Sequence, residues 1–311
     1  MTLFAFVFPG QGSQSVGMLD GWGDHPAVRR TLDEASAALH QDMAALLRNG
    51  PKDQLDLTTN TQPAMLAAGV ACWRAWLEDT GLQPCVMAGH SLGEYTALVA
   101  AGALTLAQAL PLVRFRAQAM QDAVPVGQGG MAAVLGLDAD LVQAICVEAA
   151  AGGDVVQAVN FNDPKQTVIA GSRVAVEKAC ELLKARGAKR VLPLPVSAPF
   201  HSSLMRPAAE RLKVELAATR LLPPQIPVLN NVDVLPETEP GRIRDALYRQ
   251  AFGPVRWVEV VRAIHGLGVR HVIECGPGKA LAGMVKRIAP DIVVGGVADP
   301  VGLAEAKGQM A

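Results

Sequence analysis

The chain has 311 residues, of which half are hydrophobic and 18% are charged, so it can bury a large core and is not a disordered protein. Its formal net charge of −1 gives no electrostatic basis for binding nucleic acid or an anionic membrane surface. The sequence shows neither the apolar stretch of a membrane-spanning helix nor the pattern of a signal peptide. Five scattered cysteines without a C-x-x-C pair argue against disulfides and a thiolate metal site. We therefore expect a cytoplasmic protein that binds no metal.

The first part of the chain alternates short apolar runs with helical patterns. Residues 3–8 predict a short strand that ends in a loop of Pro, Gly and Gln residues. A second apolar run at residues 85–88 predicts a buried strand end. Apolar residues at helical spacing predict further elements, namely helices over 27–39, 41–47, 63–77, 94–101 and 106–122. A break rich in Pro and Gly follows at residues 125–130.

The middle of the chain has a different order of elements. The patterns predict strands at 131–135, 155–161, 166–170 and 190–195 and helices at 139–151 and 174–186. This order, βαββαβ, is that of a ferredoxin-like unit. We therefore expect a small ferredoxin-like domain at residues 125–197, inserted into a large domain formed by residues 1–124 and 198–311.

The last third returns to alternating strands and helices. The patterns predict strands at 228–232 and 269–275 and helices at 204–218, at 243–250, at 255–267 and after Gly278. Such alternation is typical of a mostly parallel sheet with helices on both faces. The predicted fold class is therefore α/β.

Residues 89–93 have the pattern G-x-S-x-G at the point where an apolar run gives way to a helix. Glycines avoid Cβ clashes at such a turn, so Ser91 can be held in a strained conformation with its hydroxyl exposed. The start of the helix directs free backbone N–H groups toward an anion formed nearby. The pattern favours a nucleophilic serine for acyl transfer. The alternative is a glycine-rich turn whose serine only caps the helix.

A serine hydroxyl needs a base, and histidine is the usual one because its pKa lies near ~6.5. His90 adjoins Ser91, but neighbouring side chains diverge at such a turn, so we expect His90 to support the turn by packing. His201 follows a predicted strand at the return to the large domain. It is a candidate base, or alternatively a capping or interdomain packing residue. No acidic residue stands out as its partner, so a backbone carbonyl or an amide could orient the imidazole.

Three glycine-containing segments are candidates for binding an anion. The N–H of Leu92 would be one donor to an oxyanion, and Gln11, in the loop after the first strand, could supply a second N–H. That loop does not match the G-x-G-x-x-G dinucleotide fingerprint. Residues 276–283 match neither that fingerprint nor the P-loop. They indicate an ordinary turn before a helix, or a loop near a phosphate.

Arg114 and Arg116 lie on the predicted helix after the serine. Residues two apart on a helix point in different directions, so at most one of them would enter the same pocket. A buried arginine there could bind a substrate carboxylate with two parallel hydrogen bonds. The alternative for both is a solvated helix face.

With these residues collected, the chain resembles the malonyl-CoA:acyl carrier protein transacylases, the acyltransferases that load malonyl units for fatty acid synthesis. The resemblance covers nearly the whole length and rests on FVFPGQGSQSVGM, GHSLGEYTALVAAGAL, LVRFRAQAMQ, GGMAAVLGL, VNFN, PLPVSAPFHSSLM, NNVD, RQ and GPGKALAGMVKR. It implies a large hydrolase-like α/β domain with mostly parallel sheet, plus the inserted ferredoxin-like domain.

Carried over by position, the resemblance implies a role for most of the candidate residues. Ser91 looks like the nucleophile and His201 like the base. Arg116 looks like the clamp for the malonyl carboxylate. Gln11 and the N–H of Leu92 look like the oxyanion hole.

The resemblance also implies roles for four residues that the patterns alone did not single out. Gln250 matches the position whose backbone carbonyl orients the histidine. Asn162 and Asn231 match polar positions that line the cleft. In related modular acyltransferases a phenylalanine just before the catalytic histidine accompanies malonyl specificity, and this chain has Phe200.

The implied activity is a ping-pong transfer of malonyl from malonyl-CoA to the phosphopantetheine thiol of acyl carrier protein, through a malonyl ester on Ser91. Besides this thioester substrate we expect no cofactor, and we expect a monomer. Three alternatives remain at this stage. They are a serine hydrolase with the same two residues, a catalytically idle docking subunit, and the malonyl-loading subunit of malonate decarboxylase.

Overall fold

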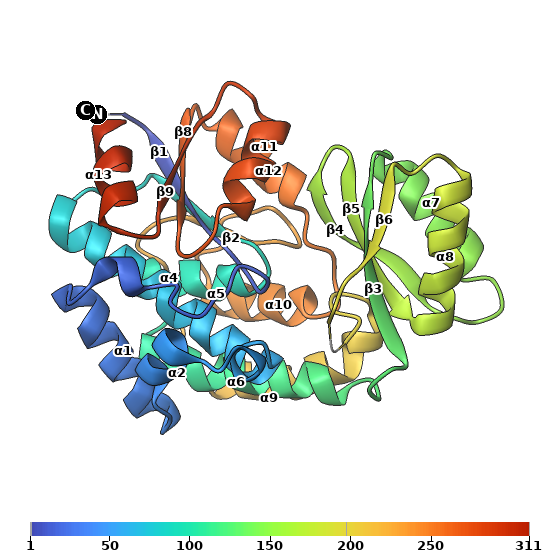
Figure 1. Ribbon diagram of the computed structural model, residues 1–311, viewed down its shortest axis with the longest axis horizontal. Helices are drawn as coiled ribbons and strands as arrows, with labels where there is room; N and C mark the ends of the chain where they lie inside the picture. The colour runs from blue at the N-terminus through green and yellow to red at the C-terminus, as the bar shows by residue number, and fades with distance from the viewer. Residues whose placement is uncertain (1, 197, 311) are drawn as a thin grey trace.

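The computed structural model describes residues 2–196 and 198–310. Over these residues the strands form two sheets, which lie side by side in Figure 1. The larger has the order β7-β2-β1-β8-β9, and every neighbouring pair is parallel. Its strands are β1 (Phe4–Phe8), β2 (Val86–Gly89), β7 (Val228–Leu229), β8 (His271–Cys275) and β9 (Val293–Val297). This confirms the expected mixed α/β fold with a mostly parallel sheet.

Helices cover both faces of the parallel sheet. They are α1 (Pro26–Leu39), α2 (Met43–Asn49), α3 (Lys52–Leu55), α4 (Thr58–Thr80), α5 (Leu92–Ala100), α6 (Leu106–Asp122), α9 (Arg206–Ala218), α10 (Pro240–Gln250), α11 (Trp257–Gly266), α12 (Ala280–Ile288) and α13 (Pro300–Gly308). Two short 3-10 helices, η1 (Asp20–Trp22) and η2 (Ser203–Met205), complete this part. None of the helices in the described part of the chain combines the length and the apolar composition that a membrane span requires.

The central strand β1 shows how the core is divided between the two faces. Alternate residues of a strand point to opposite faces. Phe6 packs edge-to-face against Trp73 and Trp76 of α4, with ring centroids 5.5 and 5.2 Å apart. Ala5 and Val7 instead join a second apolar cluster with α11 and α12. Figure 1 shows these helices on opposite sides of the sheet.

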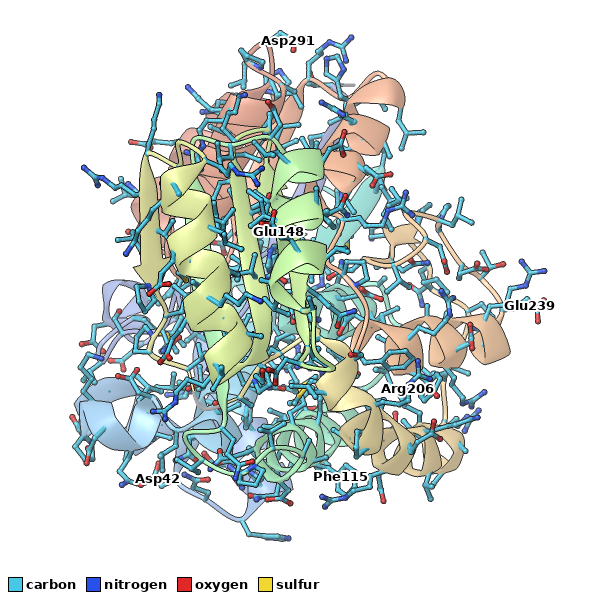
Figure 2. The ribbon with its side chains drawn as sticks, turned by 90° about the vertical axis from the view of Figure 1, so that its right-hand side faces the viewer. Asp42, Phe115, Glu148, Arg206, Glu239 and Asp291 are labelled. Carbon is cyan, nitrogen blue, oxygen red and sulfur yellow. The ribbon has the colours of Figure 1, made fainter. Side chains whose placement is uncertain are left out.

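The smaller sheet is antiparallel and has the order β4-β5-β3-β6. Its elements follow one another as β3 (Gly129–Leu135), α7 (Ala139–Ala149), β4 (Val156–Asp163), β5 (Gln166–Ser172), α8 (Arg173–Ala185) and β6 (Arg190–Pro193). Helices α7 and α8 cover one face, and Figure 2 shows them in front of the sheet with Glu148 on their outer surface. On the other face, Met131 and Val168 join the main core cluster of the larger part.

Backbone hydrogen bonds also tie the smaller sheet to the larger part. The N–H of Phe161 donates to the carbonyl of Val255, and the N–H of Val255 donates to the carbonyl of Val159, at 3.0 and 2.8 Å. The segment between α10 and α11 therefore lies against β4 as a short parallel bridge. This contact fixes one edge of the smaller sheet close to the end of α10.

The element boundaries differ from the predicted ones in a few places. The strand predicted at 228–232 is wrong beyond Leu229, because the Asn230 side chain accepts hydrogen bonds from the N–H groups of Asp233 and Val234 and turns the chain. Helix α4 begins five residues before the predicted start at Pro63. Strand β9 and helix α13 were not predicted. The domain boundary expected at residue 197, and the chain ends at 1 and 311, lie outside the described residues.

Candidate active site

Ser91 lies at a sharp turn between β2 and α5. Its backbone angles, φ 52° and ψ −107°, are in a region that is costly for a residue with a side chain. The flanking glycines make the turn sterically feasible. A Cβ on Gly89 would lie 1.9 Å from the carbonyl carbon of Gly93, and a Cβ on Gly93 would lie 2.0 Å from the carbonyl oxygen of Phe8. The predicted glycine-dependent turn is therefore present, and both glycines are needed for it.

Substituting Gly93 tests this steric argument. We expect Gly93→Ala to lower the free energy of unfolding by about 4 kcal/mol, because the new methyl group would overlap the backbone of β1. Gly266→Ala is the matched control, since nothing lies within 4 Å of a Cβ there and alanine favours the helix. Denaturant unfolding of both variants measures the difference. Equal stability of the two variants would contradict the argument.

The hydroxyl of Ser91 contacts the imidazole of His201. Ser91 Oγ lies 2.7 Å from His201 Nε2, and His201 Nδ1 lies 2.9 Å from the backbone carbonyl of Gln250 at the end of α10. A carbonyl can only accept, so Nδ1 carries the ring proton and Nε2 is free to accept from the serine. Burial, and then the charge of Arg116, lower the pKa of His201 to about 3. The imidazole is therefore neutral at pH 7 and available as a base.

Arg116 is held at the same hydroxyl by helix α6, whose start is fixed by a capping box between Thr105 and Gln108. One of its terminal nitrogens, Nη2, donates to Ser91 Oγ at 3.2 Å and to the Gln250 side-chain oxygen at 3.0 Å. The other, Nη1, donates to the side-chain oxygen of Gln62 at 2.8 Å.

Arg116 is a buried cation without a carboxylate partner among the described residues. Its side chain is only 2% exposed, and its Nε has no hydrogen-bond partner among the described residues. Burial is the main cause of the lowered pKa of Arg116, and it outweighs the opposing effects of the nearby Tyr95 and Glu94. Arg114 points elsewhere, to the Leu39 carbonyl and the Gln41 side chain. Of the two arginines, Arg116 is therefore the one placed to bind a carboxylate.

These groups open into a cavity of about 120 Å³. It is lined by Gln11, Gln62, His90, Ser91, Leu92, Arg116, Met131, Asn160, Leu194, Val196, Phe200 and His201. Strands β3 and β4 of the smaller sheet contribute Met131 and Asn160, and loops and helices of the larger part contribute the residues around Ser91. The cavity thus combines a nucleophile, a neutral base and an unpaired cation with apolar walls.

Two residues expected to line the cleft lie behind the turn instead, so this expectation was wrong. Asn231 is fully buried, and its side chain accepts from the N–H of Ser91 and donates to the carbonyl of Gly89, both at 2.7 Å. The side-chain oxygen of Asn162 lies 2.8 Å from Nε2 of His90, whose ring also packs edge-to-face on Trp257. Both asparagines support the turn, because their amides meet backbone or imidazole groups there.

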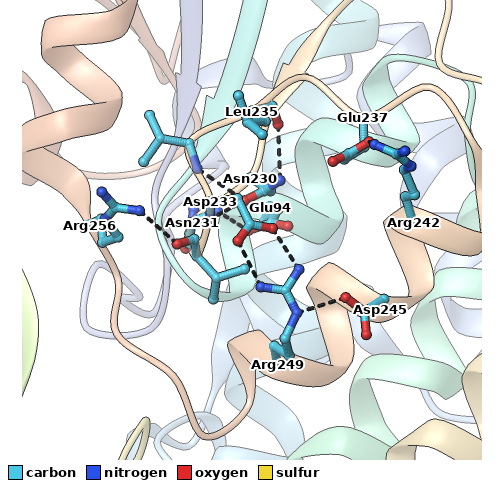
Figure 3. A network of polar contacts seen from close by, with 12 residues as sticks. Glu94, Asn230, Asn231, Asp233, Leu235, Glu237, Arg242, Asp245, Arg249 and Arg256 are labelled. Carbon is cyan, nitrogen blue, oxygen red and sulfur yellow. Dashed lines mark hydrogen bonds and ion pairs between the residues drawn. The ribbon is translucent and has the colours of Figure 1, made fainter.

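An ion-pair network holds the loop that carries Asn231. Arg249 binds the Asp233 carboxylate through two hydrogen bonds of 2.7 and 2.6 Å, and Arg256 donates to the carbonyl of Val232 at 3.0 Å. Figure 3 shows this network beside Asn231 and Glu94. The loop is therefore anchored from α10 and from the start of α11.

Sequence reasoning missed two buried polar residues at the site, Gln62 and Glu94. Glu94 is 2% exposed, and burial raises its pKa to about 7. One of its oxygens accepts hydrogen bonds from the N–H of Asn231 and from the side chain of Gln250, both at 2.9 Å. For Glu94 the available signal was the only charged side chain in its helix, LGEYTALVA, whereas Gln62 follows four other polar residues at the start of α4 and gave no such signal.

Comparison with known proteins places this geometry in a family. The family model for the acyl transferase domain matches residues 5–300. The malonyl CoA-acyl carrier protein transacylases of Salmonella typhimurium and Escherichia coli are each 52% identical over 307 residues, which cover 98% of this chain and 99% of theirs. The chain belongs to the malonyl CoA-acyl carrier protein transacylase family. It is therefore an acyltransferase.

Solved structures of this family have the same fold over 99% of this chain. An acyl-carrier-protein S-malonyltransferase from Burkholderia pseudomallei has a TM-score of 0.97 at 62% identity, covering 99% of this chain and 100% of that one. A malonyl-transacylase solved in complex with a type II polyketide acyl-carrier protein also has a TM-score of 0.97, at 48% identity and 99% and 100% coverage. The fold of the described residues is that of these transacylases.

Proposed function

We propose that this protein transfers the malonyl group from malonyl-CoA to the phosphopantetheine thiol of acyl carrier protein, through a malonyl ester on Ser91. The observation that carries the proposal is the convergence of two groups, a base and a cation, on the Ser91 hydroxyl oxygen. The Ser91 hydroxyl lies 2.7 Å from the base His201 and 3.2 Å from the unpaired cation Arg116. The names of the relatives and the solved carrier-protein complex support the same substrates.

In the first half of the reaction, His201 takes the serine proton while Ser91 Oγ attacks the thioester carbonyl. The N–H of Leu92 lies at the start of α5 and, with the N–H of Gln11, would stabilise the oxyanion. The N–H of Ser91 is already bonded to Asn231, so it does not serve as a donor. His201 then gives its proton to the departing coenzyme A thiolate. In the second half the thiol of the carrier protein repeats these steps in reverse.

Arg116 gives the site its preference for a malonyl group. A malonyl carboxylate can replace the missing counter-ion of the buried guanidinium, whereas an acetyl group leaves the cation unpaired. Phe200 and Met131 line the cavity and would contact the apolar part of the acyl group. The charge at the end of the acyl chain therefore decides which thioester reacts.

The remaining expectations form part of the proposal. The architecture is a large hydrolase-like domain of residues 1–124 and 198–311 with an inserted ferredoxin-like domain at 125–197. The element order of the smaller sheet and its strand order β4-β5-β3-β6 support it. The protein acts in the cytoplasm as a monomer, with the coenzyme A thioester as substrate and no further cofactor.

The proposal predicts a covalent intermediate. Incubation with malonyl-CoA should increase the intact mass by one malonyl group, and Ser91→Ala should show no increase, because the alanine has no nucleophile. The mass increase should persist in buffer and disappear when acyl carrier protein with its phosphopantetheine thiol is added. Rapid loss of the group to water would indicate a serine hydrolase. Carrier-protein binding without an adduct would indicate a docking subunit, and transfer only to the carrier of malonate decarboxylase would assign the other transferase.

A further inference from the structure

Gln250 connects the groups of the site through three of its atoms. Its backbone carbonyl accepts from His201, as described above. Its side-chain oxygen accepts from Arg116 at 3.0 Å. Its side-chain nitrogen donates to the carbonyl of Ser91 at 3.0 Å and to the carboxylate of Glu94 at 2.9 Å. The orientation of this one amide therefore decides whether Arg116 faces an oxygen or an N–H group.

Glu94 provides one of the two acceptors that fix that orientation, and the carbonyl of Ser91 provides the other. An amide can present either its oxygen or its nitrogen in a given direction, but the Glu94 oxygen that faces Gln250 also accepts from the N–H of Asn231 and is therefore an acceptor. The Gln250 nitrogen must then face Glu94, and the amide oxygen is left facing Arg116. Glu94 is itself held by the N–H of Asn231, which donates to the same carboxylate oxygen. Without Glu94, the carbonyl of Ser91 remains as the second acceptor of the Gln250 nitrogen, so the amide orientation is held less firmly.

The same arrangement separates the carboxyl group of Glu94 from the guanidinium of Arg116. Glu94 and Arg116 are both 2% exposed, yet no ion pair between them occurs among the described residues. The neutral amide of Gln250 lies between them and bonds to both. Among the described residues, Arg116 donates to neutral oxygens and lies over the face of the Tyr95 ring, 5.5 Å from its centre. Its charge stays available for a substrate carboxylate.

We propose that Glu94 is the positioning residue of the malonyl clamp: by accepting from Gln250 it turns the amide oxygen toward Arg116 and keeps the guanidinium free for the acyl carboxylate. This inference rests on the proposed function. It assigns to Glu94 no contact with the substrate and no proton transfer. Its effect is on the selection of malonyl over acetyl groups.

Two conservative variants separate the hydrogen bond from the charge. Glu94→Gln keeps an acceptor oxygen at the same distance and loses the charge, whereas Glu94→Asp keeps the charge but is one methylene too short to reach both donors. Glu94→Met fills the space with no comparable acceptor. We expect Glu94→Gln to keep the wild-type ratio of malonyl to acetyl kcat/KM within about 3-fold, and Glu94→Asp and Glu94→Met to lower it by about 10- to 100-fold, mainly through the KM for malonyl-CoA.

A second buried carboxylate provides the matched control. Glu274 is 1% exposed and accepts from the N–H groups of Leu281 and Ala282 at the start of α12, outside the site. Glu274→Met should lower the melting temperature without changing the malonyl to acetyl ratio. Circular dichroism and melting curves identify the variants that are folded, and the Glu94→Gln and Glu94→Asp pair decides the question if Glu94→Met does not fold.

Two results would overturn the inference. One is an equal loss of malonyl and acetyl transfer in Glu94→Asp, which would show a merely structural role. The other is a malonyl preference retained in Glu94→Asp and lost in Glu94→Gln, which would show that charge rather than hydrogen bonding matters. The wild-type assay tests the proposed function separately. If the wild type transfers malonyl and the Glu94 variants keep the wild-type ratio of malonyl to acetyl kcat/KM, only the inference about Glu94 is rejected.

Discussion

Replacing His201 by alanine is expected to lower kcat by about 10³- to 10⁴-fold for malonyl and acetyl groups alike. Among the described residues, the imidazole is the hydrogen-bond acceptor for Ser91 Oγ, at 2.7 Å. In the variant, water must take the serine proton instead. The same ring also protonates the departing thiolate, so both halves of the reaction lose their proton carrier. Single-turnover acylation of Ser91, followed by intact mass, measures the first half directly.

A surface histidine provides the control for this substitution. His265 lies at the end of α11 and pairs with Asp291 at 2.7 Å, away from the cavity. His265→Ala should keep wild-type rates. An acylation rate in His201→Ala within about 10-fold of the wild type would remove His201 from the role of base.

The turn around Ser91 could be predicted because its requirements are local. Two glycines, a preceding strand and a following helix are all readable within about fifteen residues, and the steric contacts of Gly89 and Gly93 show why no other residue fits. Alternating strands and helices likewise predicted the parallel sheet, since their periodicity depends only on neighbouring residues. The edge of that sheet was less predictable. Strand β7 ends after two residues because the Asn230 side chain accepts a hydrogen bond from the N–H of Asp233 and so turns the chain.

Side-chain partners far apart in the sequence could not be predicted from residue patterns. The approach of His201 to Ser91 spans 110 positions. The residue pattern made His201 a candidate base but left a capping or packing role open, and the family resemblance favoured the base. Asn231 was expected in the cleft, yet its amide matches the backbone donor and acceptor that the strained turn leaves unpaired. Glu94 was missed for the same reason. Its acceptor role becomes visible only when Gln250, 156 positions later, folds against it.

Replacing Arg116 by alanine is expected to lower kcat/KM for malonyl-CoA by about 10²- to 10³-fold, and that for acetyl-CoA by much less. The guanidinium is buried, so the ion pair with a malonyl carboxylate is little weakened by water, and the variant leaves that carboxylate buried and unpaired. An acetyl group makes no such contact. Steady-state kinetics with both thioesters measures the effect. Equal losses for the two acyl groups would contradict the clamp.

Arg114→Ala is the matched control, because Arg114 lies on the same helix and its bonds go to Leu39 and Gln41.

The Arg116→Ala and Arg114→Ala variants should also differ in the pH dependence of the reaction. Burial is the main cause of the low pKa of His201, and the charge of Arg116 is the second. Removing that charge raises the pKa, so a larger fraction of His201 is protonated and inactive as a base at acidic pH.

The acid limb of acetyl transfer should therefore move to higher pH in Arg116→Ala and stay in place in Arg114→Ala, when kcat/KM is measured between roughly pH 2.5 and 7, a range that includes the His201 pKa of about 3. An acid limb that is unchanged or moved to lower pH in Arg116→Ala would show that Arg116 does not act on His201.

A malonyl carboxylate paired with Arg116 neutralises the same charge. The pH profile of kcat for malonyl transfer by the wild type, which reports the loaded enzyme, should then have its acid limb above that for acetyl transfer, because only the charged acyl group raises the basicity of His201.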